Sequence, residues 1–334
     1  MEIITTYLDH LAAQGRSPAT VRAVRSDLGQ FGTWWETTYH QLWMVAVTSD
    51  RDLRHWQRSR QIDDGAAPAT INRALSTLRR FCAWAVQHGH LADNPCTELK
   101  DVATASVGPQ ALPEVAVDAL LRAARQQDDP RRSRDEALLA LLIYTGVRAQ
   151  EACDIQLRDV DLRAGTLIVR SGKGRKARRI PLHPDAVRLL DRYLSQVRCS
   201  QSMPPLGSDD ERTALLVRID PATAGRPLTP GITARGVGKV VQRLGHRGAQ
   251  LLRDSAAKLA DLQRIDELLL AAHRLDAVAP HQLRHSLARR LLTQGAQLPE
   301  IQRILGHSRL STTGMYLTPS EDDLRTAIDR MHIG

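Results

Sequence analysis

The stretch that decides the fold lies in the C-terminal third of the chain and reads His281-Gln282-Leu283-Arg284-His285. Ala279-Pro280 precedes it, and a proline at the first helical position predicts that a helix begins there. The segment Leu305-Gly306-His307-Ser308 follows, with His307 23 residues after Arg284, and Tyr316 lies nine residues after His307. Basic side chains and one tyrosine at these spacings form the sharpest functional signal in the sequence.

Two shorter motifs upstream complete this set. The first is Thr145-Gly146-Val147-Arg148-Ala149-Gln150-Glu151, which follows an apolar stretch that predicts a helix ending at its glycine. The second is Gly172-Lys173-Gly174, which separates two strand-like runs at 166–170 and 178–182. A glycine-rich turn between two such runs predicts an antiparallel hairpin with Lys173 at its tip.

The chain of 334 residues is long enough for about two domains. Residues 1–98 show only helical periodicity, with helix starts at Ser17-Pro18 and Thr48-Ser49-Asp50, and predict an all-α domain. Residues 99–111 lack periodicity and predict a linker. Residues 112–334 predict a second domain that is mainly α with a small antiparallel β-sheet, which makes it an α+β domain.

The net charge of +9 is unevenly distributed along the chain. Residues 1–110 carry eleven basic and eleven acidic side chains, so residues 111–334 carry the entire excess. A basic domain indicates a polyanionic partner, nucleic acid first, although a modest excess also serves solubility alone.

Several classes of protein are disfavoured by composition. No apolar run is long enough to span a bilayer, and the N-terminal residues do not have the pattern of a secretory signal. The four cysteines, Cys82, Cys96, Cys153 and Cys199, have no paired spacing, which argues against a zinc site and a disulfide framework. We therefore expect a cytoplasmic, nucleoid-associated protein without a metal or cofactor.

The ordered set of motifs resembles the tyrosine recombinase (phage integrase) family. Each motif alone is weak, whereas the combination with intact spacing is specific and covers most of the chain. Segments 17–21 and 69–73 resemble that family's core-binding domain, and residues 112–334 resemble its catalytic domain. The resemblance implies a site-specific recombinase that cleaves and rejoins duplex DNA through a 3′-phosphotyrosine and a Holliday junction. It also implies inverted-repeat half-sites and a homotetramer on two DNA sites, with an accessory protein as a further candidate partner.

The resemblance assigns roles that agree with the chemistry of the side chains. Two guanidiniums bind phosphate oxygens in forked geometry and stay charged at any working pH, which makes a metal unnecessary. Tyrosine, with a pKa near ~10, needs a base and a positive field to become a nucleophile. The implied set is Tyr316 as nucleophile, Arg148 and Arg284 on the phosphate, His281 as base, Lys173 as general acid and His307 as hydrogen-bond donor. Glu151 is expected to hold Arg148, and His285 to support the site.

Every assignment has a plainer alternative. Taken alone, Arg148 is explained as a surface arginine after a helix end. Most tyrosines are half-buried packing residues, and this is the alternative role for Tyr316. Lys173 lies in a basic run that is expected to contact DNA phosphates, although such runs are usually solvated faces. The basic residues expected to contact DNA are Arg175, Lys176, Arg178 and Arg179 in the hairpin, and Arg22, Arg25, Arg73, Arg79 and Arg80 in the first domain.

The segment 236–279 departs from the family by its length and strong helical amphipathy. We expect one or two extra helices, packed on their own domain in the favoured interpretation or offered to another protomer or accessory protein in the alternative. On this basis we expect a role in the integration, excision or resolution of a mobile element. Three rival functions remain: a type IB topoisomerase, a DNA-binding protein that has lost catalysis, and a metal-dependent nuclease, for which the sequence shows no carboxylate cluster.

Overall fold

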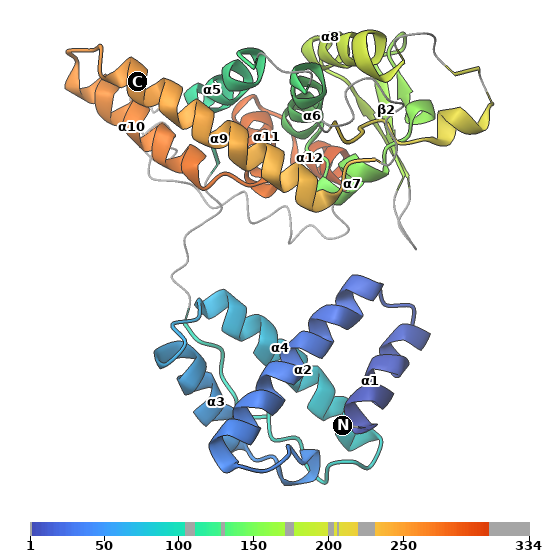
Figure 1. Cartoon of the computed structure of the whole chain (residues 1–334), viewed down its shortest axis with the longest axis vertical. Helices are drawn as coiled ribbons and strands as arrows, with labels where there is room; N and C mark the ends of the chain where they lie inside the picture. The colour runs from blue at the N-terminus through green and yellow to red at the C-terminus, as the bar shows by residue number, and fades with distance from the viewer. Residues whose placement is uncertain are drawn as a thin grey trace, which may run out of the picture. The chain divides into compact units, whose positions relative to one another are not determined.

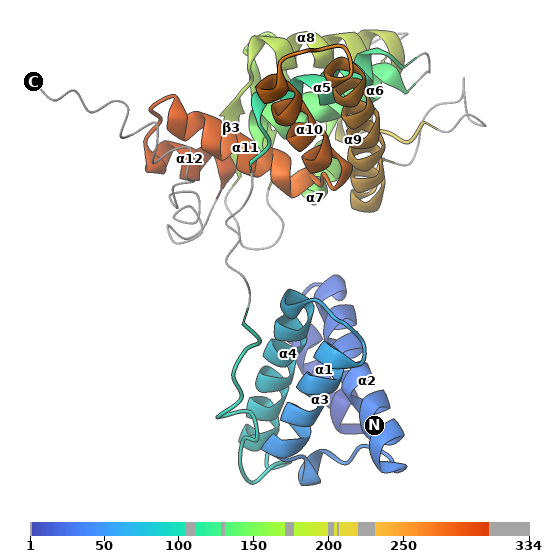
Figure 2. The same cartoon turned by 90° about the vertical axis from the view of Figure 1, so that its left-hand side faces the viewer.

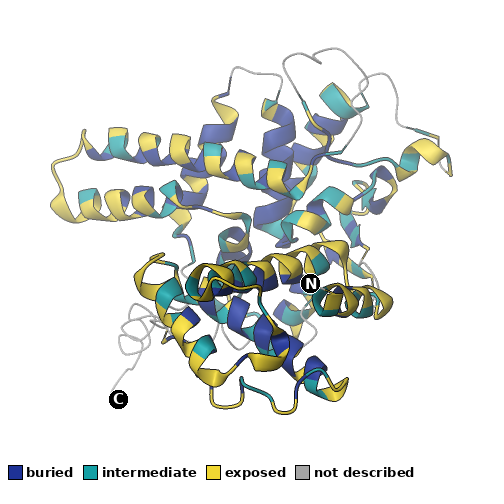
Figure 3. Ribbon diagram, turned by 60° about the horizontal axis from the view of Figure 1, so that its bottom comes forward, coloured by how far each residue is buried: buried dark blue, intermediate teal, exposed yellow. Residues whose placement is uncertain are grey.

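The computed structural model describes residues 2–103, 111–127, 131–170, 177–199, 204–205, 207–219 and 231–306. The chain divides into two compact units, Met1–Ser106 and Val107–Gly334. Each unit is described by itself below. In both, buried residues line the inward faces of the helices, and exposed residues cover the outside (Figure 3).

The first unit is built from helices, as predicted (Figure 1). They are α1 (Glu2–Ala13), α2 (Pro18–Tyr39), the 3-10 turn η1 (Val45–Val47), α3 (Asp50–Ile62) and α4 (Pro68–Gln87). The Ser17 hydroxyl accepts the backbone N–H of Thr20 at 3.1 Å, which caps α2. Ser49 and Asp52 form a reciprocal capping box at the start of α3. Both helix starts expected from the sequence are confirmed.

Aromatic rings fill the core of this unit. Phe31 is fully buried and meets Trp56 edge to face, with ring centroids 5.5 Å apart. All five tryptophans of the chain lie between residues 34 and 84. Tryptophan fluorescence therefore reports on this unit alone.

Part of the predicted linker packs on the first unit. Leu99 and Val102 are buried in its core. The Asn72 side chain on α4 also donates to the Val102 carbonyl at 2.9 Å and accepts its N–H at 2.8 Å. The chain leaves this unit only after these contacts, and the two units divide after Ser106.

The second unit combines helices with one small sheet. Its helices are α5 (Glu114–Arg125), α6 (Arg132–Thr145), α7 (Ala149–Asp154), α8 (Pro184–Tyr193), α9 (Ala234–Ala256), α10 (Leu262–Asp276), α11 (Pro280–Thr293) and α12 (Leu298–Leu305), with short turns η2 (Leu157–Asp159), η3 (Leu194–Arg198) and η4 (Asp209–Arg212). The strands β1 (Val160–Asp161), β2 (Thr166–Val169) and β3 (Arg178–Pro181) form an antiparallel sheet in that order. This confirms the predicted hairpin, in which Leu167 pairs with Ile180 and both are buried.

Helix α6 runs through the core of this unit, and its residues 133–143 are buried all round. The expanded segment forms two helices, α9 and α10, which lie side by side (Figures 1 and 2). A Cβ on Gly245 would lie 2.5 Å from the Leu275 carbonyl oxygen, so this glycine allows α9 and α10 to approach closely. The pair also packs on α5, within its own unit. Within the described ranges, no helix combines the length and apolarity that a bilayer crossing requires.

Candidate active site

The turn after α6 places Arg148 and requires a glycine. Gly146 ends α6 with φ +62°, in the left-handed region that glycine tolerates best. A Cβ there would lie 2.7 Å from Cδ2 of Leu305 and 2.9 Å from Cδ2 of Leu287. The turn therefore packs against α11 and α12, and Arg148, two residues beyond Gly146, is the N-cap residue of α7.

Arg284 on α11 joins two of the predicted motifs. Its side chain lies in the interior, with 4% of the residue exposed. Nη1 donates to the Gly146 carbonyl and Nη2 to the Leu305 carbonyl, both at 2.5 Å. These two carbonyls precede Arg148 and His307 by two residues each. The fork of one buried guanidinium thus fixes the spacing between the Arg148 turn and the end of α12.

Glu151 lies one turn beyond Arg148 and binds it twice. Oε2 accepts the Arg148 backbone N–H and Oε1 accepts Nη1, each at 2.9 Å. Burial alone would raise the pKa of Glu151, but the hydrogen bonds from Arg178 and from the Arg148 backbone, with both positive charges, hold it at about 2. The carboxylate is therefore charged throughout the physiological range. This geometry places Glu151 where the sequence predicts it, on Arg148.

Arg178, at the start of β3, is placed differently from the sequence expectation. Its Nη1 and Nη2 donate to the two oxygens of Glu151 at 3.1 and 2.8 Å, and Nε donates to the Ile304 carbonyl at 3.0 Å. Only 11% of its side chain is exposed. A DNA contact requires an accessible guanidinium, whereas all three nitrogens here bind the protein. The neighbouring Arg179 is exposed, as a DNA contact requires.

The two histidines of α11 have different environments. His281 is exposed in the first turn of α11, one turn before Arg284. His285 is half-buried, and its pKa is lowered by burial first and then by the positive charges of His281 and Arg284. The His285 imidazole is therefore neutral near pH 7, which suits a supporting group rather than a cation facing phosphate.

The remaining predicted site residues fall outside the described ranges: Lys173, Arg175, Lys176, His307 and Tyr316. Gly306, the residue before His307, is described and ends α12 with φ +67°. The described structure thus leads up to His307 from α12.

The other four tyrosines are poorly suited to nucleophilic attack. Burial raises the pKa of Tyr7, Tyr144 and Tyr193, that of Tyr193 to about 12. A hydrogen bond to Asp52 raises the pKa of Tyr39. A nucleophilic tyrosine needs the opposite shift, because the phenolate is the attacking form.

The five arginines predicted to contact DNA in the first unit fall into two groups. Arg22, Arg25 and Arg80 are exposed, and no ion pair is found for them within the described ranges. Arg73 pairs with the buried Asp27 at 2.7 Å, and Arg79 pairs with Asp101 at 2.7 Å. The last two therefore also stabilise their own unit.

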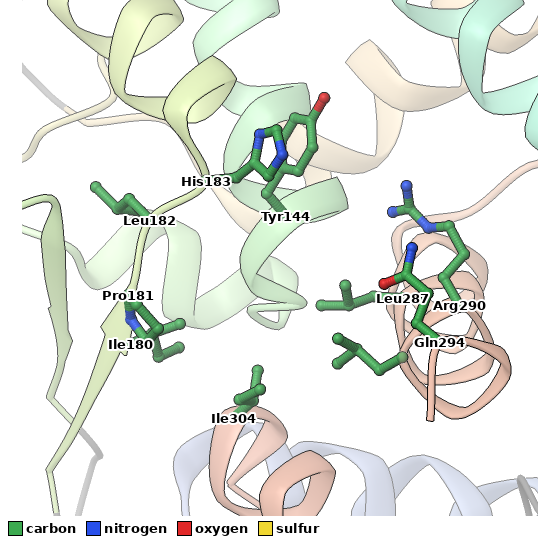
Figure 4. Close-up of a pocket in the computed structure, with 10 residues that line it drawn as sticks. Tyr144, Ile180, Pro181, Leu182, His183, Leu287, Arg290, Gln294 and Ile304 are labelled. Atoms are coloured by element: carbon green, nitrogen blue, oxygen red, sulfur yellow. The ribbon is translucent and has the colours of Figure 1, made fainter. Parts of the chain in front are cut away.

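A hollow of about 380 Å³ lies beside β3, α11 and α12 (Figure 4), and no motif in the sequence predicts it. The rings of Tyr144 and His183 stack face to face on one wall, with centroids 4.6 Å apart. Ile304 and Leu287 face them from the α11 and α12 side. The hollow forms only where α6, β3 with the residues after it, α11 and α12 lie side by side, so no local pattern predicts it. Among described residues, no cluster of histidine, cysteine or carboxylate side chains could hold a metal ion.

Comparison with protein families identifies both units. A family model described as "Phage integrase family" matches residues 110–322, and one described as "Phage integrase, N-terminal SAM-like domain" matches residues 4–89. The chain belongs to the phage integrase family of tyrosine recombinases. This tyrosine recombinase is therefore a site-specific DNA recombinase enzyme, as its motifs predict.

Relatives and solved structures support this membership along the whole chain. The "Tyrosine recombinase XerC" of Oceanobacillus iheyensis is 30% identical over 98% of this chain and 95% of its own length. The "Tyrosine recombinase XerD" of Xanthomonas campestris is 32% identical over 99% and 92%. The Tn1549 transposon integrase bound to a circular intermediate DNA has a TM-score of 0.68 at 17% identity, covering 99% of each chain. The XerH recombinase on a palindromic difH substrate has a TM-score of 0.66 at 18% identity, covering 95% and 81%. These likenesses confirm the predicted fold class.

Proposed function

We propose that this recombinase breaks and rejoins DNA by attack of Tyr316 on the scissile phosphate. The observation that carries the proposal is the pair of hydrogen bonds that Arg284 donates to the carbonyls of Gly146 and Leu305. It draws together the turn that bears Arg148 and the helix end that leads to His307. The Arg148 side chain, 29% exposed, suits contact with a phosphate whose charge grows in the transition state, and the buried Arg284 adds a permanent positive charge beside the same helix end.

The proposed reaction balances without an external energy source. The Tyr316 oxygen forms a bond to phosphorus while the bond to the 5′ oxygen breaks, which leaves a 3′-phosphotyrosine. His281 takes the tyrosine proton, and Lys173 gives a proton to the leaving 5′ oxygen. A 5′ hydroxyl from the partner strand then reverses the step. The ester conserves the bond energy, so the proposal includes no metal, cofactor or nucleotide.

The proposed substrate is duplex DNA with inverted-repeat half-sites, bound by four protomers that exchange strands through a Holliday junction. Solved relatives bound to transposon, phage core-site and palindromic DNA support a duplex partner. The exposed Arg179, Arg22, Arg25 and Arg80 are proposed to contact phosphates, with Arg175 and Lys176. An enzyme acting on such DNA works in the cytoplasm at the nucleoid. A mobile-element role and an accessory protein on α9–α10 stay predictions.

A plasmid carrying two directly repeated candidate sites, taken from the DNA flanking the gene, tests this function in EDTA. We expect the wild type to delete the intervening segment and Tyr316→Phe to leave the plasmid intact. Relaxation of supercoils without deletion, also on plasmids lacking the sites, would favour the topoisomerase instead. Tight binding with neither result would favour a non-catalytic DNA-binding protein.

A further inference from the structure

We infer that Arg178 is a positioning residue that fixes Arg148 and the end of α12 in one arrangement, rather than a DNA contact. The inference rests on the proposed function, because it assigns Arg178 a part in that site. Its basis is a set of contacts that join three separate elements, β3, α7 and α12.

The guanidinium of Arg178 uses both of its edges. One edge binds both oxygens of Glu151, whose carboxylate also holds the backbone and the side chain of Arg148. The Nε edge holds the Ile304 carbonyl in the last turn of α12. A planar fork with five donors can make both attachments at once, whereas a lysine ammonium would have to choose between them.

Gly306 shows how closely Arg178 approaches the chain before His307. A Cβ on Gly306 would lie 2.8 Å from Nη1 of Arg178 and 3.0 Å from its Cδ and Cζ. The guanidinium therefore lies against the backbone of Gly306. Loss of this side chain would free the residue next to His307 as well as the carboxylate beside Arg148.

The charges of Arg148, Glu151 and Arg178 also support a positioning role for Arg178. Glu151 carries one negative charge and lies between two positive ones, so Arg178 compensates the carboxylate and leaves the charge of Arg148 to act on a phosphate. The Arg148 side chain is 29% exposed, compared with 11% for Arg178. Without Arg178, Glu151 would neutralise Arg148. This predicts that removing the carboxylate as well restores part of the lost activity.

Single-turnover cleavage at saturating DNA, measured on a nicked duplex that the wild type binds, separates the two roles. We expect Arg178→Met to lower the cleavage rate about 100-fold, as small misplacements of catalytic groups do, and Arg178→Lys to lower it less. The Kd and its salt dependence should stay near wild type. Arg178→Met combined with Glu151→Gln should cleave faster than Arg178→Met alone. The exposed neighbour provides the comparison for the binding measurement: Arg179→Met should weaken binding and reduce the salt slope by about one.

Hydrogen exchange of the free protein provides a readout that does not depend on activity. The Gly306 amide donates to the Gln302 carbonyl at 2.8 Å, and we expect it to exchange faster in Arg178→Met and Arg178→Lys but not in Arg179→Met. A weaker Kd and smaller salt slope in Arg178→Met at an unchanged saturated rate would overturn the inference, and so would unchanged exchange at Gly306. A wild type that binds DNA but never cleaves it would refute the proposed function instead. The exchange result would then still decide whether Arg178 holds the end of α12 in place.

Discussion

Replacing Glu151 by glutamine removes the carboxylate that lies between Arg148 and Arg178. The structure gives a magnitude for this change. The pKa of Glu151 is held at about 2, compared with an ordinary value of 4.5, and only 12% of the side chain is exposed. Each pKa unit corresponds to about 1.4 kcal/mol, so the charged carboxylate stabilises the second unit by roughly 3 kcal/mol. Breaking a buried ion pair from one side typically costs about 3–5 kcal/mol, which agrees.

The same shift sets the pH dependence. Because the folded pKa is lowered, the stabilisation is complete above about pH 4.5 and is lost as the pH falls toward about 2. Urea unfolding at pH 7 should therefore separate wild type from Glu151→Gln, and the difference should shrink as the pH is lowered below 4.5. At an m-value of about 3 kcal/mol/M, the midpoint of the second unit should fall by about 1 M.

The two units provide an internal control for this experiment. Circular dichroism follows the helices of both units, whereas the fluorescence of the five tryptophans follows only the first. We expect the fluorescence transition to stay in place while the remaining dichroism transition moves. An unchanged dichroism midpoint at pH 7, or a difference between the proteins that persists undiminished near pH 2, would refute the account of Glu151.

Three further predictions use the same unfolding assay. Gly146→Ala should destabilise the second unit by about 2–4 kcal/mol, because it combines a positive φ with a Cβ pressed on Leu305 and Leu287; a shift below about 0.5 kcal/mol would contradict this. Asp27→Asn should lower the tryptophan-detected stability by about 2 kcal/mol, since Asp27 is buried and accepts from Arg73 and Thr77, while the second unit keeps its midpoint. The lowered pKa of His285 means that the unfolded chain takes up a proton below about pH 6.5 before the folded protein does, so the wild type loses stability there as pH falls. His285→Gln should flatten that slope between pH 7 and 5, and equal slopes would count against a buried neutral imidazole.

Local signals in the sequence predicted much of the fold. Ser17, Ser49 and Gly146 mark helix ends because capping and left-handed turns depend on a few neighbouring residues. The glycine-rich turn between two strand-like runs likewise predicted β2 and β3. Long-range packing was less visible: residues 99–102 lack periodicity, yet Asn72 holds them on the first unit.

The same distinction explains the candidate site. The motifs predicted Arg148, Glu151 and Arg284, and the structure brings these three around one turn. The sequence predicts Arg178 as a DNA contact within a basic run, because the partners that bind it in the folded chain lie 27 and 126 residues away. A charge run shows that the side chains are basic. Only the folded structure shows which of them pair with a largely buried carboxylate, as Arg178 does with Glu151. The stack of Tyr144 on His183 was invisible for the same reason.

The most direct test of the central claim is to trap the covalent intermediate. Wild type and Tyr316→Phe would be incubated in EDTA with nicked duplexes that the protein binds, separated on denaturing gels and digested, and the DNA-linked peptide identified by mass spectrometry. The account predicts an adduct with the wild type, joined through Tyr316, and none with Tyr316→Phe. An adduct that persists in Tyr316→Phe, or no adduct from wild type on a duplex it binds tightly, would contradict it.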